Sequence, residues 1–137
     1  MIEGALDGVV RHPIVRGIVW IERYASFVKV DFRLDLSSPT SFVSATDIGY
    51  SPLPLDDIVQ LSDDDLPITS GIPVQMLLWF DGDDAFRYSY QVPTILGDGR
   101  IRSRLGWDVL GQWTTVIDPE SATVLFAPRE WDARSPL

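Results

Sequence analysis

The stretch Val28-Lys29-Val30-Asp31-Phe32-Arg33-Leu34-Asp35, followed at once by Leu36-Ser37-Ser38-Pro39-Thr40, decides the fold of this chain. Residues 28–34 alternate apolar with polar side chains, which is the pattern of a β-strand that buries one face. The strand runs directly into an acid, Asp35, and the serines and proline that follow predict a turn. An Asp at the start of such a turn accepts nearby backbone N–H groups and is held in place. Taken alone, the stretch also fits an ordinary turn that closes a hairpin.

The composition predicts a single globular domain. The chain has 137 residues, of which 45% are hydrophobic and 23% charged, as in an ordinary folded domain with a buried core. Its net charge of −9 argues against nucleic acid and anionic membranes as partners, because both bind basic surfaces. No apolar run is long enough to cross a bilayer, and residues 1–4 lack the start of a signal peptide, so a cytoplasmic protein is expected.

The residue types also limit the chemistry. The chain has no cysteine, which excludes disulfides, thiolate metal sites and a Cys nucleophile. Its one histidine, His12, stands before the first predicted strand, so a multi-histidine metal site is excluded. Asp63, Asp64 and Asp65 form an acid run without the spacing of a calcium loop, and they are interpreted as a solvated cluster. We therefore expect no metal and no cofactor, and any acid–base chemistry is expected to use carboxylates.

The rest of the chain predicts short strands separated by turns. Strands are expected at 14–23, 28–34, 74–80 and 86–92, the first two as an antiparallel hairpin, and residues 42–44 are expected to form either a short strand or the start of a helical turn. Asp81-Gly82-Asp83-Asp84 predicts a second hairpin turn. Residues 51–67 are expected to form a loop with one helical turn at 56–61. This pattern favours an all-β sandwich or barrel, with residues 1–12 as an N-terminal arm, 13–127 as the domain and 128–137 as a C-terminal tail in which Trp131 is buried.

A second stretch, Arg104-Leu105-Gly106-Trp107-Asp108-Val109-Leu110, is followed by two strand-like segments at 113–118 and 123–126. Together with the stretch that ends in Asp35, and with Ser70-Gly71-Ile72 between them, it resembles the retropepsin-like aspartic proteases, in particular their bacterial members. In that family a strand ends in Asp-Thr-Gly-Ala and a flap follows. The domain closes with Leu-Gly-x-Asp-x-Leu, a short helix and a final hairpin. The resemblance covers residues 13–127 and implies half of a closed β-barrel or sandwich with a flap hairpin and one short C-terminal helix.

The resemblance implies a homodimeric endopeptidase that cuts extended peptides. Each subunit supplies one Asp, and the two carboxylates meet at a two-fold axis and share a proton, so that one acts as a base toward water and the other as an acid. The implied site residues are Asp35 as the catalytic acid, Leu36, Ser37 and Ser38 in the active-site turn, Ser70, Gly71 and Ile72 at the flap tip, and Arg104, Leu105, Gly106 and Asp108 in the cleft wall and closing motif. A side chain at Gly106 would crowd the active turn, and Asp108 is expected to cap the helix rather than to act as a second catalytic acid.

Several positions depart from the family pattern. Leu36 replaces the Thr whose hydroxyl braces the two active turns across the dimer axis, and Ser37 replaces a Gly whose N–H helps to hold the carboxylate. Pro39 and Trp107 stand where retroviral members have an acid–Arg pair. Arg104 stands where the family has an apolar cleft residue, and it is either solvated or directed at Asp35, where it would keep the carboxylate ionised.

These departures leave other interpretations open. One is a catalytically impaired member of the same fold that acts as a peptide-binding or regulatory module. Another, independent of the resemblance, is a small β-domain with a structural or interaction role. The aromatic residues Trp20, Trp79, Phe80 and Tyr88 are expected in the core or in cross-strand pairs, although an aromatic platform for a sugar fits the same pattern.

Overall fold

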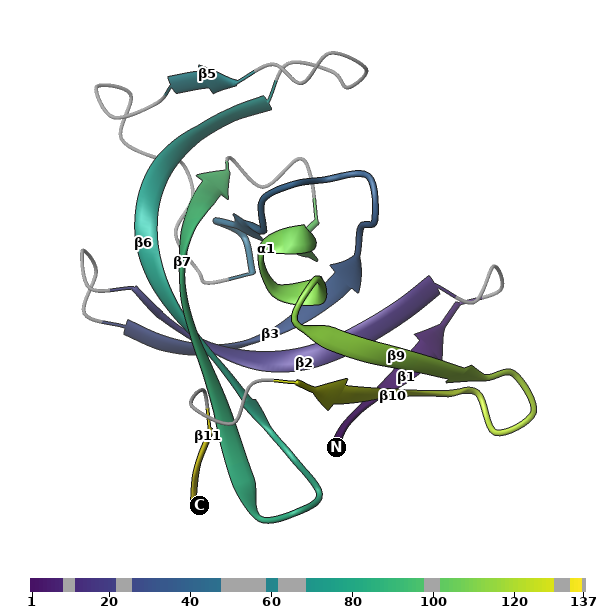
Figure 1. The fold of residues 1–137 in the computed structure, drawn as a ribbon. Helices are drawn as coiled ribbons and strands as arrows, with labels where there is room; N and C mark the ends of the chain where they lie inside the picture. The colour runs from purple at the N-terminus through teal and green to yellow at the C-terminus, as the bar shows by residue number, and fades with distance from the viewer. Residues whose placement is uncertain are drawn as a thin grey trace.

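The computed structural model describes residues 1–8, 12–21, 26–47, 59–61, 69–97, 102–129 and 134–136, and in this part the chain forms strands and one short helix (Figure 1). The elements are β1 (Ile2–Asp7), β2 (His12–Ile21), β3 (Ser26–Leu34), β4 (Phe42–Ser44), β5 (Val59–Leu61), β6 (Thr69–Asp81), β7 (Phe86–Gly97), β8 (Arg104–Leu105), α1 (Trp107–Leu110), β9 (Trp113–Asp118), β10 (Thr123–Pro128) and β11 (Arg134–Pro136).

The strands belong to one sheet with the order β5-β6-β7-β4-β8-β3-β2-β1-β10-β9, and β11 pairs with β7. Because β6 also pairs with β2, the pairings run in a ring through β2, β3, β8, β4, β7 and β6. Outside this ring the described sheet stays open, with β5 and β9 at its ends. The predicted all-β fold with one short helix near the C-terminus is confirmed. The predicted closed barrel is limited to the six strands of the ring, and the rest of the described sheet is open.

The predicted hairpin of the first two long strands is confirmed as β2 and β3, which pair antiparallel from Ile14 opposite Arg33 to Ile21 opposite Ser26. The alternation of β3 places Val30 and Phe32 in the core, where both are buried. Asp31 lies on the outer face and forms an exposed ion pair with Arg16 across the strands at 2.8 Å. The sequence alternation therefore fixes which side of β3 faces the interior.

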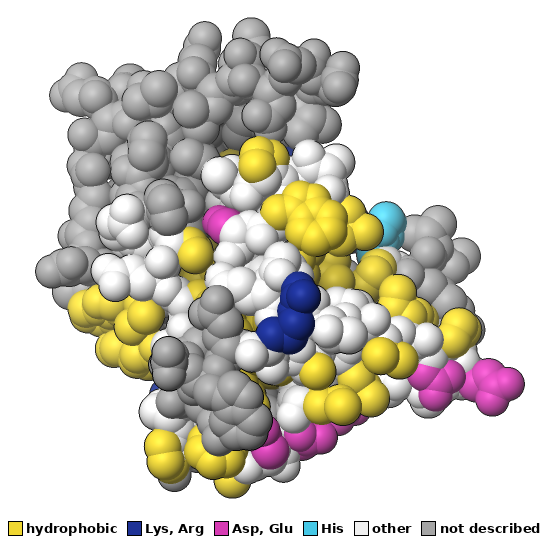
Figure 2. Space-filling model, viewed as in Figure 1, with side chains coloured by type: hydrophobic (Ala, Val, Ile, Leu, Met, Phe, Trp, Pro, Cys, Tyr) yellow, Lys and Arg dark blue, Asp and Glu magenta, His cyan; other side chains and the backbone are white. Residues whose placement is uncertain are grey.

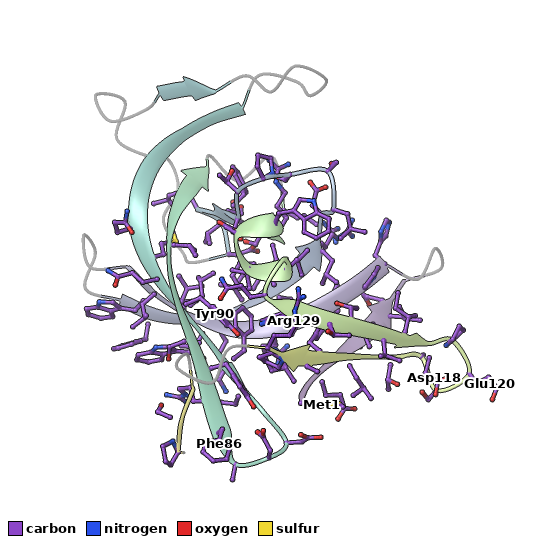
Figure 3. The ribbon with its side chains drawn as sticks, in the orientation of Figure 1. Met1, Phe86, Tyr90, Asp118, Glu120 and Arg129 are labelled. Atoms are coloured by element: carbon purple, nitrogen blue, oxygen red, sulfur yellow. The ribbon has the colours of Figure 1, made fainter. Side chains whose placement is uncertain are left out.

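An aromatic cluster fills the interior below α1. Trp113, at the start of β9, packs edge-on against Phe80 and contacts Phe126, each with ring centroids 5.0 Å apart. Its indole N–H donates to the hydroxyl of Tyr90 at 2.7 Å, and Tyr90 lies near the middle of the molecule in Figure 3. The cluster joins β6, β7, β9 and β10, so it ties the C-terminal hairpin to the ring of strands. Of the predicted aromatic positions, Phe80 and Tyr88 are buried, and the half-buried Trp20 pairs across the strands with Phe27.

The predicted turn at residues 81–84 joins β6 to β7. Gly82 donates its N–H to the carbonyl oxygen of Phe86 at 2.8 Å, and Ala85 adopts a left-handed φ of 63°. The hydroxyl of Tyr88 donates to Asp84 Oδ2 at 2.6 Å. This hydrogen bond is the main cause that lowers the pKa of Asp84 below its ordinary value.

The terminal segments are more regular than the sequence suggested. Residues 1–12, expected to form an arm, contain β1, which pairs with β10 and β2 and buries Ile2. His12 was expected to precede the first strand, but it is the first residue of β2. β11 in the C-terminal tail pairs with β7. β1 was missed because residues 1–12 show no clear alternation, although its partner β2 follows closely, and β11 was missed because its partner β7 lies far away in the sequence.

Some predictions fall wholly or partly outside the described residues. The acid run at 63–65 and Trp131 are not among them, and of the helical turn expected at 56–61 only 59–61 are described. These three residues form the strand β5, so that part of the prediction is wrong. Among the described residues, the structure has no helix whose length and apolar character would allow it to span a bilayer.

Candidate active site

Asp35 is the first residue after β3, and its carboxylate is oriented by the turn that follows. Oδ1 accepts the backbone N–H of Ser37 at 3.0 Å and the Ser37 hydroxyl at 2.6 Å. The side chain remains 24% exposed, so the carboxylate is fixed and still reaches solvent. The N–H expected from the family's Gly is thus supplied here by Ser37, because residue i+2 of an Asx-turn presents its N–H to the acid whatever its side chain.

The short strand β8 runs beside this turn. It pairs parallel with the end of β3, placing Arg104 opposite Arg33 and Leu105 opposite Leu34, and antiparallel with β4, where Arg104 lies opposite Phe42. The N–H of Asp35 donates to the carbonyl oxygen of Leu105 at 2.9 Å. The acid therefore leaves the sheet at the point where β8 separates β3 from β4.

Gly106 lies directly against the active turn. A Cβ at this position would be 2.5 Å from the carbonyl oxygen of Thr40 and 2.7 Å from that of Ser38. Both contacts are to backbone and are far below a van der Waals distance, so only glycine fits without moving the turn. The sequence stretches around Asp35 and Gly106, about 70 residues apart in the chain, therefore share one site.

Asp108 binds the loop rather than its own helix. Its Oδ2 accepts the N–H of Ser41 at 3.0 Å, and its Oδ1 accepts the Ser41 hydroxyl at 2.6 Å. The Ser41 oxygen in turn accepts the N–H of Gly106 at 3.1 Å. The expectation that Asp108 caps α1 is wrong, because Gly106 holds the cap position and no side chain caps it. Asp108 instead clamps residues 36–41 to the start of the helix.

Leu36 and Trp107 form the outer surface of the active turn. The indole N–H of Trp107 donates to the carbonyl oxygen of Leu36, and the Trp107 N–H donates to the carbonyl oxygen of Ser38 at 2.9 Å. Both side chains are more than half exposed. Pro39 lies in the same loop, and its carbonyl oxygen accepts the N–H of Asp108 at 3.2 Å. The turn is thus braced within one chain by an indole, at the position where retroviral members of the resembling family have Arg.

Arg104 is directed at Asp35. Its Nη1 lies 3.6 Å from Asp35 Oδ2, and its side chain is 16% exposed. The guanidinium also lies over the ring of Phe42, with Cζ 5.4 Å from the ring centroid. Of the two positions considered for Arg104, the structure has the one beside the acid rather than the one in solvent.

The three residues expected at the flap tip lie in extended backbone. Ser70 and Gly71 in β6 pair with Gln60 and Val59 of β5, and Ile72 pairs with Leu96 of β7. They therefore belong to the stem of the β5–β6 hairpin, whose connecting residues 62–68 lie outside the described part, as do the side chains of residues 70–72. The described contacts bring the Asp35 turn together with Arg104, Leu105, Gly106 and Asp108, but not with Ser70, Gly71 or Ile72.

An apolar hollow of about 370 Å³ adjoins the turn on the side of β9. Its lining residues are Pro13, Leu34, Leu36, Trp107, Leu110, Trp113, Thr115 and Ile117. Figure 2 shows hydrophobic side chains gathered over this part of the surface, from the helix toward the C-terminal hairpin. The exposed side of the candidate site therefore continues into an apolar surface.

The described residues hold no cluster of three or more His, Asp or Glu side chains that could bind a metal ion. Sequence reasoning missed Ser41, which is fully buried and links Asp108 to Gly106. It also missed Ser103, buried beneath β8, whose hydroxyl accepts the N–H of Ser44 and donates to Asp47. Neither serine has a partner near in sequence, so no local pattern could have indicated its role.

Comparison with solved structures gives the class of fold. The chain is similar to the crystal structure of a retropepsin-like aspartic protease from Rickettsia conorii, with a TM-score of 0.58 and 14% sequence identity over 91% of this chain and 88% of that one. No protein-family model matches the sequence. No curated protein matches it either. The fold is therefore that of the retropepsin-like aspartic proteases.

Proposed function

We propose that this chain is one subunit of a homodimeric aspartic endopeptidase, in which Asp35 from each of two copies activates water for hydrolysis of an extended peptide. The observation that carries the proposal is the Asp35 carboxylate, oriented by Ser37 and packed beside Gly106 on a retropepsin-like fold. Two carboxylates that meet at a two-fold axis cannot both stay ionised, so they share one proton. The unprotonated one then removes a proton from water while the other protonates the peptide oxygen or nitrogen.

The second copy is expected to dock on β9. This strand lies at an end of the sheet and pairs with β10 alone among the described strands. The side chains of residues 114–118 are all exposed, including Val116 and Ile117 on opposite faces, and no charge occurs before Asp118. Figure 3 places Asp118 and Glu120 at the far tip of this hairpin, away from the helix. Natural proteins rarely leave such an edge bare, because it pairs readily with another strand.

The position of β9 favours a second copy of this chain as the partner. Ile117 and Thr115 line the same hollow as Leu36 of the active turn and Trp107 of the helix. A two-fold axis through this surface would pair β9 with its copy and bring two Asp35 turns toward each other. The chain carries a net charge of −9, so copies repel one another except where an uncharged surface such as this one meets its equal.

A second candidate function rests on Arg104. Its guanidinium forms an ion pair with Asp35 at 3.6 Å, at a position where the resembling family has an apolar cleft residue, and this pair competes with the contact between two carboxylates that the mechanism needs. Leu36 also lacks the hydroxyl that braces the two turns in the resembling family. The alternative is a dimer of the same fold that binds peptides, or regulates a partner through them, without cutting them.

Cleavage of an unfolded protein substrate across a range of pH tests the proposal. The wild-type chain is expected to cut at acidic pH, and Asp35→Asn should reduce the rate by at least about 10³-fold. Asp31→Asn is the matched control, since it removes a carboxylate on the outer face of the same strand, and it should retain activity. A dimer that binds peptide but does not turn it over would support the binding module instead. Equal cleavage by wild type and Asp35→Asn would exclude Asp35 as the catalytic group.

A further inference from the structure

The guanidinium of Arg104 is largely enclosed, and one of its nitrogens, Nε, lacks a hydrogen-bond partner among the described residues. Its side chain is only 16% exposed, and Nε itself is buried. Its contact with Asp35 is 3.6 Å, longer than the distance of about 2.7–2.9 Å typical of a charge-assisted hydrogen bond. The Phe42 ring under the guanidinium supplies attraction to the positive charge but no hydrogen-bond acceptor for the N–H groups.

Such an arrangement favours a further acceptor. Arginine presents five N–H donors in a planar fork that matches the two oxygens of a carboxylate, and leaving donors unpaired in an enclosed site is unfavourable. Asp35 cannot fill this role, because its Oδ1 is held by both the N–H and the hydroxyl of Ser37. The Ser37 turn therefore keeps Asp35 from closing a two-point pair with Arg104.

The other acids of this region do not supply the acceptor that Arg104 lacks. Asp108, the other acid of the closing motif, has both its oxygens bound by Ser41. Asp47, which follows β4, accepts the hydroxyl of Ser103 and stands beside Arg102 and Arg33 around a separate pocket. Among the described residues, Asp35 is the acid that pairs with Arg104.

We propose that Arg104 recognises a carboxylate of the bound peptide, from an Asp or Glu side chain or from the peptide C-terminus, next to Asp35. The location of the peptide rests on the proposed function, while the recognition itself does not require cleavage. The carboxylate of the ligand pairs with the guanidinium and competes with Asp35 for it. An acidic peptide thereby loosens the Arg104–Asp35 contact and leaves Asp35 free, whereas a neutral peptide leaves the pair in place.

The net charge of the chain makes a preference for acidic peptides easy to assign to a local cation. With a charge of −9, the molecule as a whole repels acidic peptides. A preference for Glu over Gln therefore points to a local cation, and among the described residues Arg104 is the cation that pairs with Asp35.

Binding of matched fluorescent peptides to the Asp35→Asn protein tests the proposal. One set carries a single Glu or Gln at each successive position with an amidated C-terminus, and a second carries Gln throughout with a free or amidated C-terminus. We expect one carboxylate position to bind about tenfold more tightly than its amide counterpart. Adding Arg104→Leu should abolish the preference, and adding Arg104→Lys should keep part of it, since Lys retains the charge without the planar fork.

The outcomes separate this proposal from the proposed function. A preference for acid that is lost in the Arg104→Leu variant supports it even if the wild-type protein cleaves nothing. Equal binding of acidic and amide peptides, a preference that survives Arg104→Leu in a folded protein, or no binding of either set overturns it even if cleavage by Asp35 is found. Circular dichroism and gel filtration of each variant show whether the fold and the oligomeric state are kept.

Discussion

At the scale of single residues, the candidate site combines an acid held by an Asx-turn with side chains that differ from those of the family it resembles. The Asx-turn needs a backbone N–H two residues after the acid, and Ser37 provides it as well as glycine does. Gly106 is different, because a Cβ at this position would lie 2.5 and 2.7 Å from backbone oxygens that cannot easily move aside. The turn therefore accommodates Ser37 in place of the family's glycine, but it does not accommodate a side chain at Gly106.

Substitutions at Arg104 and Leu36 test whether these two residues limit peptide cleavage. The double variant Arg104→Leu, Leu36→Thr removes the cation beside Asp35 and restores a hydroxyl on the exposed side of the turn. We expect it to raise kcat/KM on a neutral peptide by at least about tenfold, because Asp35 no longer pairs with a cation of its own chain and can pair with the second carboxylate. The measurement is the initial rate on a quenched fluorescent peptide at acidic pH.

Arg102→Leu serves as the control for that double variant, since it removes an exposed arginine only two residues away that does not pair with Asp35. Its rate should match that of the wild type. No gain in a double variant that stays folded and dimeric would mean that the Arg104–Asp35 pair does not limit turnover.

At the scale of elements, the strands with a clear local pattern could be predicted from the sequence, whereas β1, β5, β11 and the contact between Ser41 and Asp108 could not. The alternation at 28–34 and the turn at 81–84 are local patterns, and both predicted hairpins are present in the sheet. The clamp between Ser41 and Asp108 joins residues 67 positions apart, so nothing near either residue indicates it. Asp108 was assigned to its own helix because the first turn of a helix commonly attracts an acid, but here a buried loop hydroxyl competes successfully for it.

The clamp is expected to contribute to stability. Asp108→Asn removes the charge of the acceptor, and Ser41→Ala removes a buried hydroxyl that also accepts the N–H of Gly106. Each change should cost about 1–3 kcal/mol in the free energy of unfolding, because it leaves a buried partner unsatisfied. The double variant should cost less than the sum, since the two residues share one interaction. Urea unfolding of the four proteins of this cycle measures the coupling, and strict additivity would contradict a direct clamp.

The turn between β6 and β7 leads us to expect that the stability of the fold depends on pH. The Tyr88 hydroxyl lowers the pKa of Asp84 below the ordinary value of 3.8, so folding favours the ionised carboxylate. The resulting stability is present above the ordinary pKa and is lost as the pH falls through the lowered one. We expect Asp84→Asn to lower the free energy of unfolding at neutral pH by less than about 1 kcal/mol, because the group is exposed to solvent, and therefore to lower the urea midpoint slightly. Near pH 2 the two proteins should unfold at the same urea concentration, and a difference that persists there would exclude titration of Asp84 as its cause.

At the scale of the whole molecule, the sheet leaves one apolar edge bare beside the candidate site. Its pairings run in a ring, and β1, β10 and β9 continue the sheet beyond that ring (Figure 1). Thr115 and Ile117 of β9 line the same hollow as Leu36 and Trp107. The sequence predicted the C-terminal hairpin but not this exposure, because the exposure depends on which strand ends the sheet. A single chain supplies one Asp35, so the proposed dimer would place its second copy at this edge.

Ile117→Lys tests that arrangement. Ile117 is 51% exposed, so a lysine there should leave the fold intact, while two lysines brought together by a two-fold axis would repel each other and lose apolar contact. We expect a shift from dimer to monomer in light scattering after gel filtration, with loss of any cleavage that depends on Asp35. Gln91→Lys is the matched control, because it adds the same charge at an exposed position of β7, away from β9, and should stay dimeric. If Ile117→Lys remains a dimer, the copies meet at another surface, and if the wild type is itself a monomer that cleaves peptides, the two-fold site is wrong.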